Sequence, residues 1–278
     1  MKTLPTRKRR RAPRITPENV DKHLLYQWSV QNPEGEVEFM EWVYRARRGR
    51  RPLVLREDFC GTAHTACHWV KSHPRRRALG LDLDTETLAW GRENNVAPLG
   101  TASKRVDLRL KDVRNTTRPL ADVVCALNFS YYLFDQLADL TAYFRKVRRS
   151  LAPGGIIVLD NYGGWESQQL KEEPRRIKTP QGTFTYIWHQ ADYNPIDNRA
   201  LCHIHFKFSD GKMWRKAFTY DWRLYSPAEV RDALLAAGFR NVEVYWDHEE
   251  DTEKEEDYRV ASRAENTPGW LTYVVADG

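Results

Sequence analysis

The sequence predicts a doubly wound α/β fold with a mostly parallel sheet and an inserted antiparallel β-meander. Two observations carry this prediction. Between about residues 52 and 161, short apolar segments alternate with helical segments, which is the pattern of parallel strands joined by crossover helices. After residue 165 this pattern stops, and residues 183–222 alternate polar and apolar side chains with a period of two, which is typical of antiparallel strands.

The composition is that of a packed globular protein. Hydrophobic residues make up 41% of the 278 residues, and aromatic residues make up 12%. No apolar run approaches the roughly 18 residues of a membrane helix, and the amino terminus lacks the apolar stretch of a secretory signal. The four cysteines are irregularly spaced, as suits reduced thiols. We therefore expect a cytoplasmic protein.

The net charge of +6 is concentrated in the first 14 residues. This segment carries seven cations and no acid, so the remaining chain has a net charge of −1. We expect residues 1–16 to form a disordered basic arm and not a basic face of the folded body. Because such an arm attracts phosphate polymers without specificity, a nucleic-acid partner stays open as an alternative.

Two helices are expected before the sheet, over residues 17–50. The first, at 17–31, would begin at Thr16 and Pro17, because threonine caps helices and proline suits their first turn. The second, at 35–48, would end at Gly49, with arginines in its last turn.

Residues 51–278 then form one domain with an insertion at about 166–224. The expected strands of its first part are 52–57, 77–83, 105–110, 122–128 and 155–161, and the helices between them are about 63–72, 85–95 and 135–150. After the insertion, a helix should begin at Ser226 and Pro227 and end at Gly238. Two more strands follow, "RNVEVYWD" and "WLTYVVAD".

Acidic and amide residues follow the predicted parallel strands, whose carboxyl ends share one edge of the sheet. They are Glu57, Asp82, Asp112, Asn128 and the pair Asp160-Asn161. Asp82 lies 21 residues beyond Gly61, the spacing at which an acid accepts hydrogen bonds from ribose hydroxyls. Asp112 and Val113 could meet an adenine. The pattern indicates an adenosine-containing cofactor.

The loop after the first strand narrows the choice of cofactor. A dinucleotide fingerprint needs three glycines, and only Gly61 is present; no phosphate-binding "GxxxxGK[ST]" loop occurs either. Phe59 and Ala63 are tolerable beside a cofactor that has no phosphates, and S-adenosylmethionine is such a cofactor.

From about residue 50 onward the chain resembles the class I S-adenosylmethionine-dependent methyltransferases. "VLREDFCGTA" is similar to their first motif, usually "vLDlGCGTG", with Phe59 in place of the first glycine; "ALGLDLDTETL" and "LKDVRN" resemble the second and third, and "RSLAPGGIIVLD" the turn before the fifth strand. The resemblance implies a Rossmann-like seven-stranded sheet that ends in an antiparallel hairpin. It also implies S-adenosylmethionine as cofactor and S-adenosylhomocysteine as product. The cofactor-binding residues that it suggests, with Tyr26 of the first helix added, are Glu57, Gly61, Ala63, Asp82, Leu83, Asp112, Val113, Asn128 and Tyr26.

The methyl acceptor should lie beyond the fourth and fifth strands, at "NFSYYLF" and "DNYGGW". Methyl transfer is an in-line displacement, so the protein must align a nucleophile and, if needed, take up a proton. The candidate catalytic residues are Tyr131, Asn161 and Tyr162, and the candidate substrate residues are Trp165, Arg223 and Tyr225.

Three functions compete. The first is methylation of a nitrogen or oxygen of a small molecule, because the insertion and the "YSPAEVRDALLAAGF" helix resemble methyltransferases acting on small amines and amino sugars, where an insertion roofs the acceptor pocket. The second is methylation of RNA or another polymer docked by the arm, and the third is a non-catalytic regulator that binds the cofactor. No metal is expected: Cys60 and His64 belong to a zinc-like cluster, but Cys60 lies in the cofactor loop. The oligomeric state is not predicted.

Overall fold

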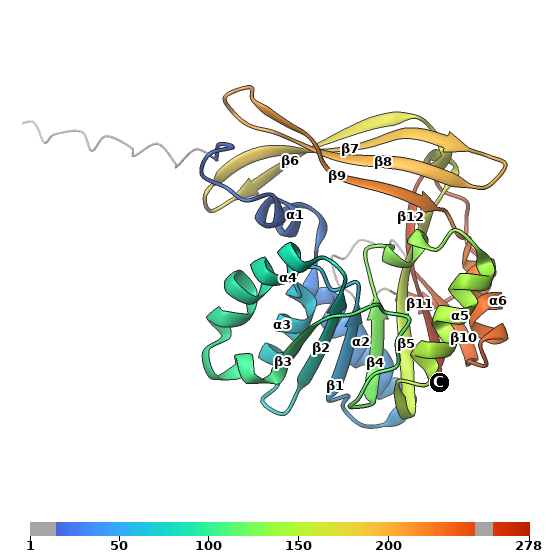
Figure 1. Ribbon diagram of the computed structural model, residues 1–278. Helices are drawn as coiled ribbons and strands as arrows, with labels where there is room; N and C mark the ends of the chain where they lie inside the picture. The colour runs from blue at the N-terminus through green and yellow to red at the C-terminus, as the bar shows by residue number, and fades with distance from the viewer. Residues whose placement is uncertain (1–14, 248–257) are drawn as a thin grey trace, which may run out of the picture.

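The structure is a computed structural model that describes residues 15–247 and 258–278 (Figure 1). The predicted basic arm lies outside these residues except for its last two positions. There the expectation of disorder is wrong, because Ile15 is 2% exposed and packs in an apolar cluster with Leu25 of the first helix and Phe206 of the insertion. No helix in the described ranges is both long and apolar enough to cross a membrane.

The main sheet is mixed, and in the described residues it contains eight strands in the order β11-β10-β12-β5-β4-β1-β2-β3. The strands β1 to β5 are parallel to one another, whereas β12, β10 and β11 are antiparallel to their neighbours. Their bounds are β1 Val54–Asp58, β2 Arg77–Asp82, β3 Val106–Leu110, β4 Ala121–Ala126, β5 Leu151–Gly163, β10 Arg240–Asp247, β11 Tyr258–Val260 and β12 Trp270–Asp277. The predicted doubly wound α/β fold is confirmed.

The strand number is a correction, since seven strands were expected. The additional strand, β11, has only three residues and pairs with the outer side of β10, where Tyr245 lies opposite Val260. Its sequence, "YRV", follows an acidic segment of the chain and is too short to show a period of two. A short terminal strand of this kind covers the exposed edge of β10.

Helices cover both faces of the main sheet (Figure 1). One face packs against α2 (Pro33–Arg48), α3 (His64–Ser72) and α4 (Thr85–Gly91), and the other against α5 (Leu137–Arg148) and α6 (Pro227–Ala236). Within β4 the side chains alternate, so Val123 faces the first group of helices and Val124 faces the second.

Local capping residues explain most helix ends. Gly49 ends α2 in the left-handed conformation, with a φ of 66°, and Ser226 starts α6 with a capping box completed by Glu229. The first helix begins later than expected, because α1 runs from Lys22 to Val30 and its cap is Asp21, whose carboxylate accepts from the backbone N–H of His23. Pro17 precedes it in a turn.

The insertion is an antiparallel four-stranded meander of β6 (Lys171–Thr179), β7 (Gly182–Asn194), β8 (Arg199–Lys207) and β9 (Met213–Arg223). Figure 1 shows it above the carboxyl ends of the parallel strands, with α1 beneath it. The strand β6 was not predicted, because its sequence, "KEEPRRIKT", is polar and contains proline. Both features are tolerated since β6 is the edge strand.

Helix α4 packs closely against the loop after β1, and Gly91 permits this approach. A Cβ atom at Gly91 would lie 2.6 Å from the carbonyl oxygen of Thr62, which belongs to that loop. Asn95, one turn further, donates from Nδ2 to the same carbonyl at 2.8 Å. The loop is therefore held from the side of α4.

We expect Gly91→Ala to lower the free energy of unfolding by about 1–3 kcal/mol, although alanine normally stabilises a helix relative to glycine. The cause is the contact with the Thr62 backbone, which cannot rotate away. Chemical denaturation would measure the change. Gly269→Ala is the matched control, since nothing lies within 4 Å of a Cβ atom there; equal stabilities of the two variants would contradict the prediction.

Candidate cofactor and acceptor site

The loop of residues 59–63, which we call the cofactor loop, leaves β1 with an unusual backbone. Phe59, Gly61 and Ala63 have φ values of 55°, 50° and 59°, a region that L-residues seldom adopt. The backbone N–H of Gly61 donates to Oδ2 of Asp82 at 2.7 Å, which joins the loop to the end of β2. The loop thus keeps a glycine-type conformation at two positions that lack glycine.

The ends of β2 and β3 present the residues expected to meet ribose and adenine. Asp82 accepts at Oδ1 from the backbone N–H of Asp84 at 2.9 Å, and the neighbouring Leu83 is 67% exposed. In the turn after β3, Arg114 pairs with Asp112 at 2.6 Å and lowers the pKa of its carboxyl. Val113 is buried in the core. Leu83 offers an apolar surface beside the Asp82 carboxylate.

Two buried carboxyls lie at the same edge of the sheet. Glu57 accepts at Oε2 from the backbone N–H of Ala66 at 2.8 Å, and Asp160 accepts from the backbone N–H groups of Asn128 and Phe129 at 2.6 and 2.9 Å. Burial raises the pKa of Glu57 to about 8 and the pKa of Asp160 to about 8, in both cases with a contribution from the Glu36 carboxylate. A cationic ligand here would restore the charged form of these groups.

Helix α1 links this edge to the meander. Gln27 is buried and donates from Nε2 to the hydroxyl of Thr62 at 2.9 Å, in the cofactor loop. On its other side the Tyr26 ring packs against Phe218 of β9, with centroids 4.9 Å apart. Tyr26 also accepts a hydrogen bond from the hydroxyl of Tyr220.

A cavity of about 430 Å³ opens between the meander, α1 and the ends of β4 and β5. Seven aromatic side chains line it: Tyr26, Phe129, Tyr162, Tyr186, Trp188, Tyr220 and Trp222. The rings of Tyr220 and Trp222 are stacked, with centroids 4.4 Å apart, and the ring centroids of Phe129 and Tyr162 are 4.7 Å apart. The hydroxyl of Tyr162 is buried and has no hydrogen-bond partner among the described residues. Its hydrogen-bonding capacity is therefore unused by the described residues.

Of the candidate catalytic residues, only Tyr162 lines this cavity. Tyr131 is fully buried and donates to the carbonyl of Asp160 at 2.9 Å, while Asn161 donates from Nδ2 to the Tyr131 hydroxyl and to the carbonyl of Tyr225. The structure therefore does not place Tyr131 and Asn161 where they could touch an acceptor. Tyr131 and Asn161 instead hold the backbone that lies beneath the cavity.

The candidate substrate residues also lie outside the cavity lining. Arg223 donates to the carbonyl of Asp135 and pairs with Glu229, and the Tyr225 hydroxyl donates to the carbonyl of Phe134 at 2.6 Å. These two residues join the end of β9 to the main domain. Trp165 is 48% exposed and precedes Glu166, which does line the cavity.

The structure reveals lining residues that were not predicted. Lys171 and Glu173 come from the unexpected strand β6, and Pro268 and Gly269 come from the loop before β12. The aromatic wall could have been found, because the period of two in β7 and β9 places Trp188 on one face with Tyr186, and Trp222 with Tyr220.

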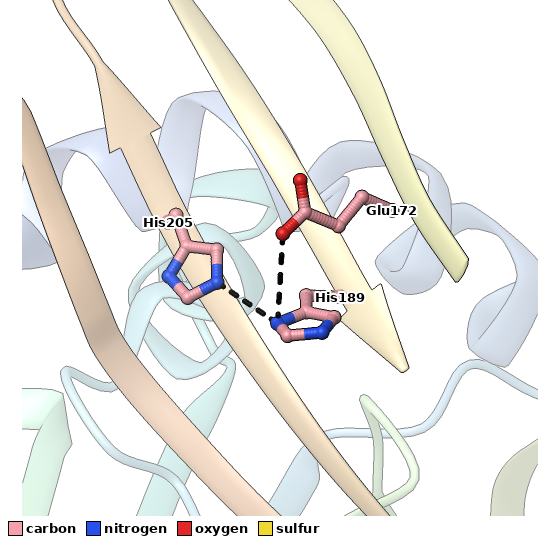
Figure 2. A group of neighbouring side chains, drawn as sticks. All are labelled: Glu172, His189 and His205. Carbon is pink, nitrogen blue, oxygen red and sulfur yellow. Dashed lines mark hydrogen bonds and ion pairs between the residues drawn. The ribbon is translucent and has the colours of Figure 1, made fainter. Parts of the chain in front are cut away.

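The histidines of the meander face away from the cavity. Figure 2 shows His189, His205 and Glu172, whose potential ligand atoms all lie within 4.8 Å of one another. Nδ1 of His205 accepts from the backbone N–H of Lys216 at 2.7 Å, so the ring proton is on Nε2, which points at Nδ1 of His189 at 3.2 Å. A metal ligand needs a free lone pair on that Nε2 atom. The three side chains thus contact one another, since Nδ1 of His189 also lies 3.8 Å from Oε1 of Glu172.

The chain matches known methyltransferases in part of its sequence and in its fold. Residues 60–157 match the family model of a methyltransferase domain. No curated protein matches the chain in sequence.

Solved structures share the fold over nearly the whole chain. One is an S-adenosylmethionine-dependent methyltransferase from Clostridium acetobutylicum, at a TM-score of 0.68 and 16% identity, covering 92% of this chain and 96% of that one. DesVI from Streptomyces venezuelae has a TM-score of 0.69 and 18% identity, covering 93% and 98%. CalS10 from Micromonospora echinaspora, an amino pentose methyltransferase solved with S-adenosylmethionine bound, has a TM-score of 0.64 and 17% identity, covering 92% and 95%.

The carboxyl edge of the sheet fits S-adenosylmethionine as the cofactor. The buried carboxyls of Glu57 and Asp160 suit a ligand that carries a sulfonium and an ammonium group. Asp82 offers carboxylate oxygens for ribose hydroxyls, and Leu83 offers apolar surface for adenine.

We expect Asp82→Ala to remove most of the stabilisation that S-adenosylmethionine gives the wild-type protein. At a ligand concentration of 100 times Kd that stabilisation should be about 2.7 kcal/mol, measured as a thermal shift. Asp84→Ala is the control: it removes the cap of α4, which costs about 1 kcal/mol, but leaves the ligand-induced shift intact. If Asp82→Ala showed the same ligand-induced thermal shift as the wild type, Asp82 would not be a cofactor-binding residue.

Cofactor affinity should rise with pH below about pH 8, because the pKa of Glu57 is about 8. The cationic ligand favours the charged carboxylate, so binding releases a proton and tightens by up to about tenfold per pH unit per coupled carboxyl. Calorimetric titrations at pH 6, 7 and 8 would measure this in the wild type and in Glu57→Gln. The difference between the two proteins cancels the titration of the ligand itself; parallel pH profiles would refute the role of Glu57.

Proposed function

We propose that this chain is a class I S-adenosylmethionine-dependent methyltransferase and that it methylates an amine of a small molecule enclosed beneath the meander. The observation that carries the proposal is the roofed aromatic cavity at the ends of β4 and β5. Its volume of about 430 Å³ is in the range of small-ligand pockets. An amino sugar is an acceptor of suitable size, and the similar protein CalS10 is an amino pentose methyltransferase.

The polar groups of the cavity favour an amine over a hydroxyl. A hydroxyl acceptor needs a base that takes its proton during the transfer, whereas a neutral amine already has a nucleophilic lone pair. The carboxylates that line the cavity, Glu166 and Glu173, are both paired with Lys171, at 2.6 and 2.8 Å. No histidine is present in the lining formed by the described residues. A free general base is thus missing from this part of the wall.

The aromatic wall suits the proposed acceptor in two ways. Flat rings such as Trp188 and Trp222 offer apolar surface to the faces of a sugar ring, and their negative ring faces stabilise the positive charge that develops on a neutral amine as it takes the methyl group. The Tyr162 hydroxyl can accept a hydrogen bond from the amine or donate one to a sugar hydroxyl. S-adenosylmethionine supplies the activated methyl group, and the chain supplies the alignment and the exclusion of water.

Two other functions from the sequence are not favoured by this geometry. A polymer acceptor would require an open groove at the carboxyl edge of the main sheet, and the meander lies above that edge (Figure 1). A purely regulatory protein would not require an aromatic cavity adjoining the expected cofactor edge.

A panel of amino sugars, each paired with the same sugar bearing a hydroxyl in place of the amine, would test the proposal. We expect release of S-adenosylhomocysteine with an amine member and not with its hydroxyl partner. With that acceptor, Tyr162→Phe should lower kcat/KM about 5- to 30-fold, the effect of losing one buried hydrogen bond, without changing cofactor affinity.

Tyr193→Phe is the control, because its hydroxyl bonds to Asn198 at the far end of β7, outside the cavity. Activity on hydroxyl acceptors alone, or equal effects of the two tyrosine substitutions, would overturn the proposed acceptor chemistry.

A further inference from the structure

We propose that Arg56 is a positioning residue for the cofactor, which holds the turn of residues 112–117 from within the core. We call this segment the adenine turn, because it contains Asp112 and Val113. The inference concerns the cofactor end of the site, so it does not depend on the identity of the acceptor. It rests on the hydrogen bonds of one buried guanidinium group.

The guanidinium of Arg56 is enclosed, with its side chain 1% exposed, and binds the fully buried carboxylate of Asp58. Nε donates to Oδ1 at 2.6 Å and Nη2 donates to Oδ2 at 3.0 Å, which is the two-pronged geometry that fixes both planes. The hydroxyl of Tyr143, on α5, donates to the same carboxylate at 2.8 Å. Asp58 and Tyr143 therefore fix the orientation of the arginine.

The remaining N–H groups of Arg56 reach the adenine turn. Nη2 donates to the carbonyl of Val113 at 2.6 Å, and Nη1 donates to the carbonyl of Asn115 at 3.1 Å. Nη1 also contacts the hydroxyls of Thr117 at 3.2 Å and Ser150 at 2.9 Å. One side chain thus ties three positions of the turn to the central strand β1.

Few other hydrogen bonds connect this turn to the body of the protein. The Asp112–Arg114 ion pair and the bond from the N–H of Asn115 to the carbonyl of Asp112 lie within the turn itself. Thr117 gains one more tie, because its N–H donates to the Ser150 hydroxyl at 3.1 Å. The carbonyls of Val113 and Asn115 consequently depend on Arg56 for their position.

Burying the charged side chains of Arg56 and Asp58 in a central strand costs desolvation free energy. The first methyltransferase motif usually has apolar residues at the positions of Arg56 and Asp58, and apolar residues of similar volume are often as stable as a buried pair or more so. Stability alone therefore does not account for this pair. Holding two carbonyls of the adenine turn does account for it, since leucine could not do so.

The test uses the triple variant R56L/D58L/Y143F, which makes the network apolar without leaving an unpaired charge or hydroxyl on these three residues. We expect it to fold with a lower Tm, because the carbonyls of Val113 and Asn115 lose their donor, and to bind S-adenosylhomocysteine about tenfold more weakly, because the turn loses its anchor. Hydrogen exchange should become faster at the amides of residues 113–117 in particular. Y193F is the control, with Kd within twofold of the wild type, because the Tyr193 hydroxyl bonds to Asn198 and has no part in the Arg56 network.

If the triple variant does not fold, Arg56→Lys can replace it in the test. Lysine can pair with Asp58 but cannot also bind the carbonyls of both Val113 and Asn115. It too should weaken S-adenosylhomocysteine binding and loosen residues 113–117. A folded variant with wild-type Kd would overturn the proposal. So would loss of exchange protection spread evenly over the sheet, since that result would make Arg56 a structural residue only.

Discussion

The hydrogen bond from the backbone N–H of Gly61 to the carboxylate of Asp82 is the constraint around which the carboxyl edge is built. It joins the cofactor loop to β2, and the backbone N–H of Cys60 donates to the carbonyl of Leu81 beside it. The loop needs such ties because Phe59 and Ala63 have positive φ values, each of which costs of the order of 1 kcal/mol. Packing of α4 at Gly91 and the Gln27 bond from α1 hold the same loop from two further sides.

Buried carboxyls in this protein fall into two groups. Asp58 binds an arginine, and Asp122 accepts from Tyr44, Arg50 and two backbone N–H groups, which lower its pKa despite burial. Glu57 accepts hydrogen bonds from a backbone N–H and from the Thr65 side chain, Asp160 accepts hydrogen bonds from backbone N–H groups, and the pKa values of both carboxyls are about 8. The first group is paired with an arginine within the protein. The second forms no ion pair with the described residues and lies at the edge where we expect the cofactor to bind, as is typical of a functional site.

The cofactor edge could be predicted from the sequence because its residues depend on local order. Each acid follows an apolar strand, and parallel strands bring their carboxyl ends together whatever the details of packing. The acceptor residues could not be chosen in this way. Asn161 and Tyr162 were both proposed, but neighbouring residues of a strand point to opposite faces, so only one of them can line a cavity on one side of β5.

The sequence also does not say which face of a strand turns toward the cavity. For this reason the meander was predicted, but its contribution to the cavity lining was predicted only in part. Its period of two separates an aromatic face from a face that carries His189 and His205, yet the sequence does not say which face turns toward the sheet. Helix α1 decides this, because Tyr26 and Leu25 need apolar partners and the aromatic face supplies them. The opposite register would place histidines against α1 and turn the aromatic residues to the other face of the meander, away from their apolar partners.

Cofactor and acceptor regions are therefore closed by one continuous layer. Helix α1 bonds to the cofactor loop through Gln27 and packs on the meander through Tyr26, one residue earlier in the chain. A displacement of the meander would have to separate α1 from its apolar partners or break the bond to Thr62, which lies beside Gly61. The acceptor roof and the cofactor loop are thus mechanically coupled through two adjacent side chains.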